Sequence, residues 1–148
     1  MLLSKLNPNI KKCPFCYINP EKTRIIYSKP LTMVILSNPR LVTGHLLVIP
    51  KKHVEKLTEL TQEEKNELIN TVINFQEKIL SKISKGCDIR QNYHPFQKQN
   101  KIKVDHLHIH LIPRSLHDKL FLKIQIHETK LFAMMNNEEL EQSKLLFS

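Results

Sequence analysis

The chain has 148 residues, the length of one ordinary domain, and its 41% hydrophobic and 25% charged residues are typical of a globular protein. No apolar run approaches the roughly 20 residues that cross a bilayer, and the start of the chain lacks a signal-peptide core. These features argue against a disordered, secreted or membrane-spanning chain. We therefore expect a cytoplasmic protein with no membrane partner.

The net charge is +9, from 23 Lys and Arg against 14 Asp and Glu. Such a charge favours anionic partners through its long-range field, although a solvated, lysine-rich surface explains it equally well. The chain has only 2 glycines, Gly44 and Gly86, which excludes both common glycine-rich phosphate loops. Any phosphate chemistry must therefore use side chains or an isolated helix end.

Five strands are predicted. Four short runs of branched and apolar residues predict strands at 24–28, 31–36, 45–50 and 89–93, the last of them weakly patterned. The fifth run, 104–112, alternates between two faces and is expected to end at Pro113, because proline cannot donate to a strand ladder. Polar residues separate these runs, and no linker divides the chain.

A long helix is predicted over 61–84. Thr61 and Glu64 match a capping box at its start, and Gly86 fits a left-handed cap just after its end. Apolar residues recur at helical spacing and predict one buried stripe, formed by Leu68, Ile69, Val72, Ile73, Ile79, Leu80 and Ile83. A second, short helix is predicted over 137–147.

The most informative motif is a row of three histidines, His106, His108 and His110, that alternate with Leu107 and Ile109. On a strand, neighbouring members of the row lie roughly 6.6 Å apart. Zinc holds nitrogen ligands at about 2.0–2.1 Å, so three of these side chains on one ion would require a sharply bent strand. A two-histidine metal site stays open.

A row of imidazoles along a substrate is the other chemical interpretation. Neutral imidazole is a nucleophile at pH 7, since its ordinary pKa lies near 6.5, and it can donate a proton once charged. The middle ring could attack while its neighbours orient it or stabilise developing charge. The alternative is a row of half-buried sheet residues without chemistry, which the regular alternation argues against.

The row His106–Ile112 resembles the signature of the histidine triad nucleotide hydrolases and transferases. Gly44–His53 resembles the second conserved block of that family, and Cys13–Cys16 resembles its usual opening. The three matches occur in family order across about residues 13–114. The chain is therefore identified as a member of this family, one domain over 1–148 in which 115–148 is a variable C-terminal extension.

The resemblance implies an α+β fold, with an antiparallel meander sheet of about five strands and the 61–84 helix packed on one face. It also implies a homodimer and no organic cofactor. In the family, the middle histidine attacks the α-phosphorus of a nucleotide and forms a covalent nucleotidyl-histidine, a role that falls to His108. A backbone carbonyl on a neighbouring strand usually holds its other nitrogen. His110 and His45 would donate to the phosphoryl oxygens.

The resemblance also implies roles for other residues that stand at matching family positions. Asn92 matches the family asparagine that helps hold the phosphate. Ser37 stands where the family has an acid or amide that binds the ribose hydroxyls, and the adjacent Asn38 can substitute. Apolar candidates for a nucleobase slot are Phe15, Ile26 and Leu36, for each of which ordinary core packing is the alternative.

Two positions depart from the family pattern. Ile102 stands where the family has glutamine, and Lys103 stands where it has a hydroxyl residue. The side chain of Ile102 cannot form a hydrogen bond, whereas Lys103 can place an ammonium near a polyphosphate. We hypothesise that Lys103 favours dinucleoside polyphosphates over phosphoramidates.

Cys13 and Cys16 have the spacing of metal ligands, although two small buried residues are the alternative, and nothing around them indicates a thioredoxin-like site. If 45–50 and 104–112 are antiparallel neighbours, His53 falls at the same end as His106. These histidines would then complete a Cys₂His₂ site, as in bacterial family members that carry this CxxC. The resemblance thus implies a structural zinc.

The leading hypothesis is a hydrolase that acts at the α-phosphate of dinucleoside polyphosphates or nucleoside phosphoramidates and releases a nucleoside monophosphate. The family's transferase branch carries glutamine in place of His110, which favours hydrolysis here. One alternative is a relative that removes adenylate from nucleic-acid ends. Only 6% of the residues are aromatic, so no stacking platform is evident and nucleic acid is not expected as a partner. A nucleotide-binding regulator with little turnover is the other alternative.

Overall fold

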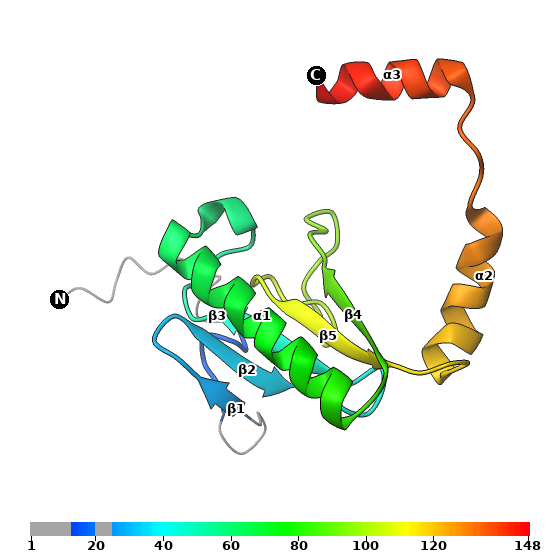
Figure 1. Cartoon of the computed structure of the whole chain (residues 1–148). Coiled ribbons are helices and arrows are strands. Elements are labelled where there is room, and N and C mark those ends of the chain that lie inside the picture. The colour runs from blue at the N-terminus through cyan, green and yellow to red at the C-terminus, as the bar shows by residue number, and fades with distance from the viewer. Residues whose placement is uncertain (1–12, 20–24) are drawn as a thin grey trace. The chain divides into compact units, whose positions relative to one another are not determined.

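The computed structural model describes residues 13–19 and 25–148 (Figure 1). Five strands form one antiparallel sheet in the order β1-β2-β3-β5-β4. The strands are β1 (Ile25–Ser28), β2 (Thr32–Leu36), β3 (Leu46–Pro50), β4 (Gly86–Gln91) and β5 (Ile109–Arg114). This confirms the predicted α+β fold. The sheet departs from a simple meander because β5 returns between β3 and the edge strand β4.

Helix α1 (Gln62–Lys82) lies across one face of the sheet, and a short 3₁₀ turn, Leu57–Glu59, precedes it (Figure 1). The Thr61 hydroxyl accepts from the Glu64 backbone N–H, and the Glu64 carboxylate accepts from the Thr61 N–H, as the capping box predicts. Gly86 is not a left-handed cap: it begins β4, where an added Cβ would lie 3.1 Å from the Arg114 carbonyl oxygen.

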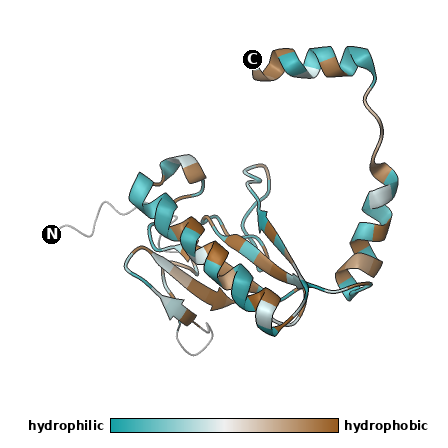
Figure 2. Ribbon diagram, viewed as in Figure 1, coloured by the Kyte–Doolittle hydropathy of each residue, from teal (hydrophilic) through white to brown (hydrophobic). Residues whose placement is uncertain are grey.

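Apolar residues recur along α1 (Figure 2), but the predicted stripe is only partly buried. Leu68, Val72 and Ile79 face the sheet together with Phe75, whereas the other predicted members stay about half exposed: Ile69, Ile73, Leu80 and Ile83. The helix therefore carries a second apolar face that the sheet does not cover.

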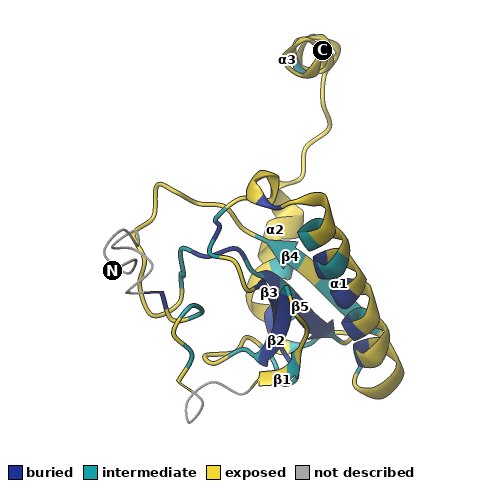
Figure 3. Ribbon diagram, turned by 90° about the vertical axis from the view of Figure 1, so that its left-hand side faces the viewer, coloured by how far each residue is buried: buried dark blue, intermediate teal, exposed yellow. Residues whose placement is uncertain are grey.

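Strands β2, β3 and β5 are largely buried (Figure 3), and the strands carry apolar residues on both faces. Val34, Val48 and Leu111 pack with α1, while Ile35 and Leu47 belong to a smaller cluster on the opposite face. Phe15 and Ile18 of the N-terminal segment pack against this second cluster. The opposite face of the sheet is thus available for a site.

Strand β5 is shorter and later than predicted. Val104–His108 is a bent segment rather than strand, and β5 continues through Pro113 to Arg114. Only residues 109–111 of β5 pair with β3, so beyond Leu111 the strand pairs with β4 alone. Proline lacks a backbone N–H, and on the side of Pro113 where no strand pairs, no N–H donor is required. The prediction that Pro113 ends the strand is therefore wrong.

The chain divides into two compact units, Met1–Ser115 and Leu116–Ser148. The second unit contains helical turns, Phe121–Gln125, α2 (Ile126–Glu128) and Thr129–Leu131, followed by helix α3 (Asn137–Phe147), which has the predicted bounds. None of the helices in the described residues is long and apolar enough to cross a membrane. The assignment of both units to one domain stays a prediction.

Candidate functional site

A cavity of about 680 Å³ lies over the sheet face opposite α1. The described residues that line it include four histidines (His45, His94, His108, His110), seven large apolar residues (Phe15, Ile35, Leu36, Leu41, Leu47, Ile102, Ile112) and four cationic residues (Arg40, Arg90, Lys101, Lys103). No Asp or Glu is among these described lining residues. The lining is therefore apolar at some points, positively charged at others, and suited to an anionic ligand with an apolar part.

Strand register brings the histidines to this cavity. His110 of β5 pairs with Leu47 of β3 and with Arg90 of β4. Residues paired across antiparallel strands share a face, so all three side chains lie on the cavity side of the sheet. His108 precedes β5 by one residue, and its ring lies 4.9 Å from the ring of His110.

The His108 ring is held at one nitrogen by the backbone. Its Nδ1 lies 2.6 Å from the carbonyl oxygen of His106, so Nδ1 carries the proton and donates, and Nε2 keeps its lone pair. Burial lowers the pKa of His108, which keeps the ring neutral at pH 7. The acceptor is two residues back in the same segment, not on a neighbouring strand as expected. His108 Nε2 can therefore act as a nucleophile.

His110 has the opposite tautomer, set by His45. The Leu41 backbone N–H donates to His45 Nδ1 over 3.1 Å, so His45 carries its proton on Nε2. His45 Nε2 lies 2.9 Å from His110 Nδ1 and donates to it. His110 is therefore protonated on Nε2, where it can donate a hydrogen bond to a ligand.

Both rings of this pair are neutral. Burial, followed by the charge of Arg90, lowers the pKa of His45 to about 4. Burial, followed by repulsion from His108, His45 and Arg90, lowers the pKa of His110 to about 3. At pH 7 the hydrogen-bond chain from Leu41 through His45 to His110 is thus fixed in one direction.

The other predicted ligand-binding residues also line the cavity: Ser37, Asn38, Asn92 and Lys103. The Ser37 hydroxyl donates to the Pro39 carbonyl oxygen over 2.8 Å, and the Lys103 ammonium bonds to the Asp105 carboxylate and the Gln97 carbonyl. Ile26, a predicted base contact, lies on β1, about half exposed, and is not among the residues described as lining the cavity.

Arg90 was missed by sequence reasoning. Its run, 89–93, is weakly patterned, and no motif marks an arginine there as functional. The pairing of β4 with β5, which the sequence pattern does not contain, sets Arg90 opposite His110.

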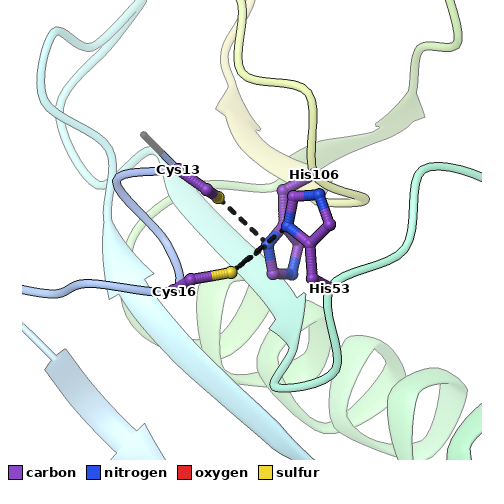
Figure 4. Close-up of side chains that lie close together, drawn as sticks. All are labelled: Cys13, Cys16, His53 and His106. Carbon is purple, nitrogen blue, oxygen red and sulfur yellow. Dashed lines mark hydrogen bonds between the residues drawn. The ribbon is translucent and has the colours of Figure 1, made fainter. Parts of the chain in front are cut away.

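A second group of side chains lies beside the cavity (Figure 4). Cys13, Cys16, His53 and His106 each offer one ligand atom, and these atoms all lie within 4.8 Å of one another. Cys13 Sγ is 3.3 Å and Cys16 Sγ 3.5 Å from His106 Nδ1, and Cys16 Sγ is 3.2 Å from His53 Nδ1. The four residues predicted as ligands are thus brought together and can hold a metal ion.

The donor set fits tetrahedral zinc. Sulfur at about 2.3 Å and nitrogen at about 2.0–2.1 Å from one ion lie roughly 3.5 Å from each other, close to the distances found here. His106 Nε2 donates to the Pro50 carbonyl oxygen over 2.8 Å, which leaves Nδ1 unprotonated and turned towards the sulfurs. Burial, with the neighbouring Cys13, raises the pKa of Cys16 to about 12, so a bound cation would be needed to hold that thiolate.

The two groups are connected through the CxxC segment. Phe15, between the cysteines, places its ring edge-to-face against His106 and His108 at 5.8 and 5.4 Å. His106 supplies a candidate metal ligand from its ring and the acceptor for His108 from its backbone. The cysteine–histidine group therefore positions both one wall of the cavity and the candidate nucleophile.

Comparison with known proteins gives a consistent result. A family model described as "HIT domain" matches residues 19–117. A bis(5'-nucleosyl)-tetraphosphatase (asymmetrical) of Schizosaccharomyces pombe is 27% identical over 123 residues, which are 78% of this chain and 65% of that protein. The chain thus matches slightly less than two thirds of that relative. An adenosine 5'-monophosphoramidase of the same organism is 35% identical over 74 residues, 48% of this chain and 49% of that protein.

Solved structures agree. A HIT family protein from Bacillus anthracis matches with a TM-score of 0.65 and 23% identity over 91% of this chain and 94% of that one, which bears on the fold alone. A zinc-bound histidine triad family protein from Mycobacterium smegmatis matches with a TM-score of 0.60 and 29% identity over 75% of this chain and 81% of that one. Because the family model covers about two thirds of the chain, the protein belongs to the HIT domain family.

Proposed function

We propose that the protein hydrolyses nucleoside phosphates at the α-phosphate through a covalent bond to His108. The observation that carries this proposal is the pair of opposite tautomers at the cavity. His108 presents a lone pair on Nε2, and His110 presents an N–H on Nε2. A nucleophile beside a fixed donor is the arrangement that phosphoryl transfer to a side chain requires.

The first step forms a bond between His108 Nε2 and the α-phosphorus and breaks the bond from phosphorus to the leaving group. The positive charge that develops on the ring is stabilised by the His106 carbonyl, which already accepts from Nδ1–H. The His110 N–H stabilises negative charge on a phosphoryl or leaving-group oxygen, while His45 holds His110 in that tautomer.

The second step uses water as the nucleophile. Water attacks phosphorus, the bond to His108 Nε2 breaks, and the ring returns to its neutral form. The nucleoside monophosphate leaves, and the proton of the attacking water passes to solvent. Two displacements of lower barrier thus replace one that is difficult.

We propose dinucleoside polyphosphates as the preferred substrates, with nucleoside phosphoramidates as the second class. The tetraphosphatase and phosphoramidase relatives support both classes. The four cationic residues of the lining, without an acid among the described lining residues, favour the more anionic class. Ser37, Asn38 and Asn92 are proposed contacts of the nucleotide, as predicted.

A substrate panel assayed with the parent protein and with His108→Ala tests this function. The parent is expected to release nucleoside monophosphate from at least one of the two classes, and His108→Ala should abolish release. A parent that binds nucleotides without turnover would instead support the nucleotide-binding regulator. Turnover only of adenylated nucleic-acid ends would support that alternative.

We further propose that zinc occupies the cysteine–histidine group as a structural ion. The distances, the Pro50 hydrogen bond and the zinc-bound relative support this assignment. The site contains four protein ligands, which is typical of closed structural zinc, and would supply no chemistry to substrate. We also propose a cytoplasmic location, because zinc-binding cysteines must stay reduced and that compartment keeps thiols reduced.

A homodimer is proposed as well, with α1 and β4 as the surface. β4 is an edge strand that carries the half-exposed Ile89, and α1 exposes Ile69 and Ile73 beyond the sheet. An edge strand with apolar side chains is a ready pairing surface, and a second copy offers the same one.

A further inference from the structure

Arg90 is the positively charged residue most firmly placed in the cavity. It lies on β4, half-buried, directly opposite His110, whereas Arg40 is exposed in a loop. Its charge contributes to the lowered pKa values of both His45 and His110, so the guanidinium lies within electrostatic reach of those rings.

The guanidinium of Arg90 has no bonding partner among the residues that the structure describes. It forms no hydrogen bond or ion pair with any residue in 13–19 or 25–148. The contrast with its neighbours is clear, because Arg114 pairs with Asp88 and Lys103 pairs with Asp105. A half-buried charge beside neutral imidazoles is unfavourable in the free protein, and an anion in the cavity would compensate it.

The strand order places Arg90 at one end of the site. Ile35 and Leu36 of β2 and Leu47 of β3 supply apolar lining on one side of the histidines, and His110 follows on β5. Arg90, on the edge strand β4, lies beyond His110 on the side away from β2 and β3. With a nucleoside over β2 and β3 and its α-phosphate at the histidines, the phosphates beyond the α-phosphate would extend towards β4.

We propose that Arg90 binds the phosphate next to the reacting one, in the leaving group, and so makes the site selective for polyphosphate leaving groups. This inference rests on the proposed function. The planar guanidinium can form two parallel hydrogen bonds with a phosphate, which an ammonium cannot. Arg90 would thus supply the free cationic group that Lys103, bonded to Asp105, does not.

Catalytic efficiency on two probes tests the proposal: diadenosine tetraphosphate, and adenosine 5'-phosphoramidate, which has no second phosphate. Arg90→Gln should lower kcat/KM for the tetraphosphate by about 10- to 100-fold, as expected for a lost charge-assisted hydrogen bond, and leave the phosphoramidate unchanged. Arg90→Lys should restore part of the loss. Lys82→Gln removes the same charge at the exposed end of α1 and should change neither substrate.

An equal loss on both substrates would overturn the proposal, because Arg90 would then act on the α-phosphate or on the histidines. No loss on either would overturn it as well. The unfolding midpoint of Arg90→Gln is expected to stay the same or to rise, since the guanidinium has no partner in the described residues to lose and its half-buried charge is unfavourable in the free protein.

Calorimetric binding of ADP and AMP separates this inference from the proposed hydrolysis. The parent should bind ADP more tightly than AMP, and Arg90→Gln should abolish that difference. If the parent turns over neither probe, the hydrolysis proposal fails, yet the ADP and AMP affinities still decide the role of Arg90. A difference that survives in Arg90→Gln contradicts the inference whatever the turnover.

Discussion

Two histidines separated by one residue acquire different chemistry because different groups hold their Nδ1 atoms. His108 donates from Nδ1 to a carbonyl, whereas His110 accepts at Nδ1 from His45. The residue types and positions could be predicted from the row of histidines and its family resemblance. The tautomers could not, because the Leu41 N–H and the His106 carbonyl that set them are backbone groups placed by the fold.

His45 is predicted to act by positioning His110. His45→Ala should lower kcat by about 100-fold with little change in KM, because His110 Nδ1 loses its donor and the ring can adopt the other tautomer. His45→Gln, whose amide can donate, should recover part of the activity. A larger change in KM than in kcat would indicate direct substrate contact by His45 instead.

The buried histidines also predict how stability depends on pH. His45 and His110 have folded-state pKa values of about 4 and about 3, below the ordinary value near 6.5, so the unfolded chain binds more protons under acid conditions. Their contribution to stability is fully present above about pH 6.5 and is lost as the pH falls towards 4 and below. Thermal unfolding midpoints at pH 7.5 and pH 5 measure this effect. His45→Asn should reduce the dependence, whereas the exposed His94→Gln should not; identical dependence in all three proteins would contradict the assignment.

Local signals predicted whole elements where the interactions that define them are local. The Thr61–Glu64 capping box fixed the start of α1, and its end differs from the prediction by two residues. The bounds of β5 were wrong because they depend on register with β3 and β4, which the sequence pattern does not contain. The four half-exposed residues of the α1 stripe were likewise indistinguishable, by periodicity, from those that face the sheet.

Burial at the helix–sheet contact gives a direct comparison between α1 residues. Leu68 is fully buried and Ile73 is 50% exposed. Leu68→Ala should lower the free energy of unfolding by about 2–5 kcal/mol, while Ile73→Ala in a monomeric sample should change it by roughly 0.5 kcal/mol or less. Urea denaturation measures both, and equal losses would contradict the packing described here.

The proposed zinc site makes the CxxC segment an element whose stability should depend on a metal. Cys16→Ser should abolish stoichiometric zinc and lower the unfolding midpoint, because the thiolates and imidazoles lose the ion that holds them together. Elemental analysis and thermal unfolding provide the two measurements. Cys87→Ser is the matched control, since Cys87 lies on β4 outside this group and should leave the zinc content unchanged. Full zinc in Cys16→Ser would contradict the four-ligand site.

At the scale of the whole molecule, the five-stranded sheet and its covering helix were predicted from the family resemblance rather than from periodicity. Periodicity predicts individual strands but not their order in the sheet. The position of β5 between β3 and β4 depends on contacts between residues far apart in the sequence. The second compact unit begins at Leu116, and its interpretation as a variable extension of one domain stays a prediction. Its helix α3 was predictable because its amphipathic pattern and its Asn136 cap are local.

The proposed dimer interface on α1 and β4 can be tested by substitution. Ile73→Asp should convert a dimer to a monomer in light scattering, because it buries a charge in a self-complementary contact. Ile26→Asp changes an equally exposed isoleucine on the opposite edge strand β1 and should leave the dimer intact. A monomeric parent, or dissociation by the β1 variant alone, would exclude this interface.

The proposed hydrolysis depends most on the bond between phosphorus and the Nε2 atom of His108. A single-turnover reaction with a dinucleoside polyphosphate, stopped rapidly and analysed by peptide mass spectrometry without acid treatment, tests that bond directly. We predict one nucleoside monophosphate group attached to the peptide that contains His108, formed and lost at rates compatible with turnover. Product release without such a group, or the group on another residue, would contradict the account.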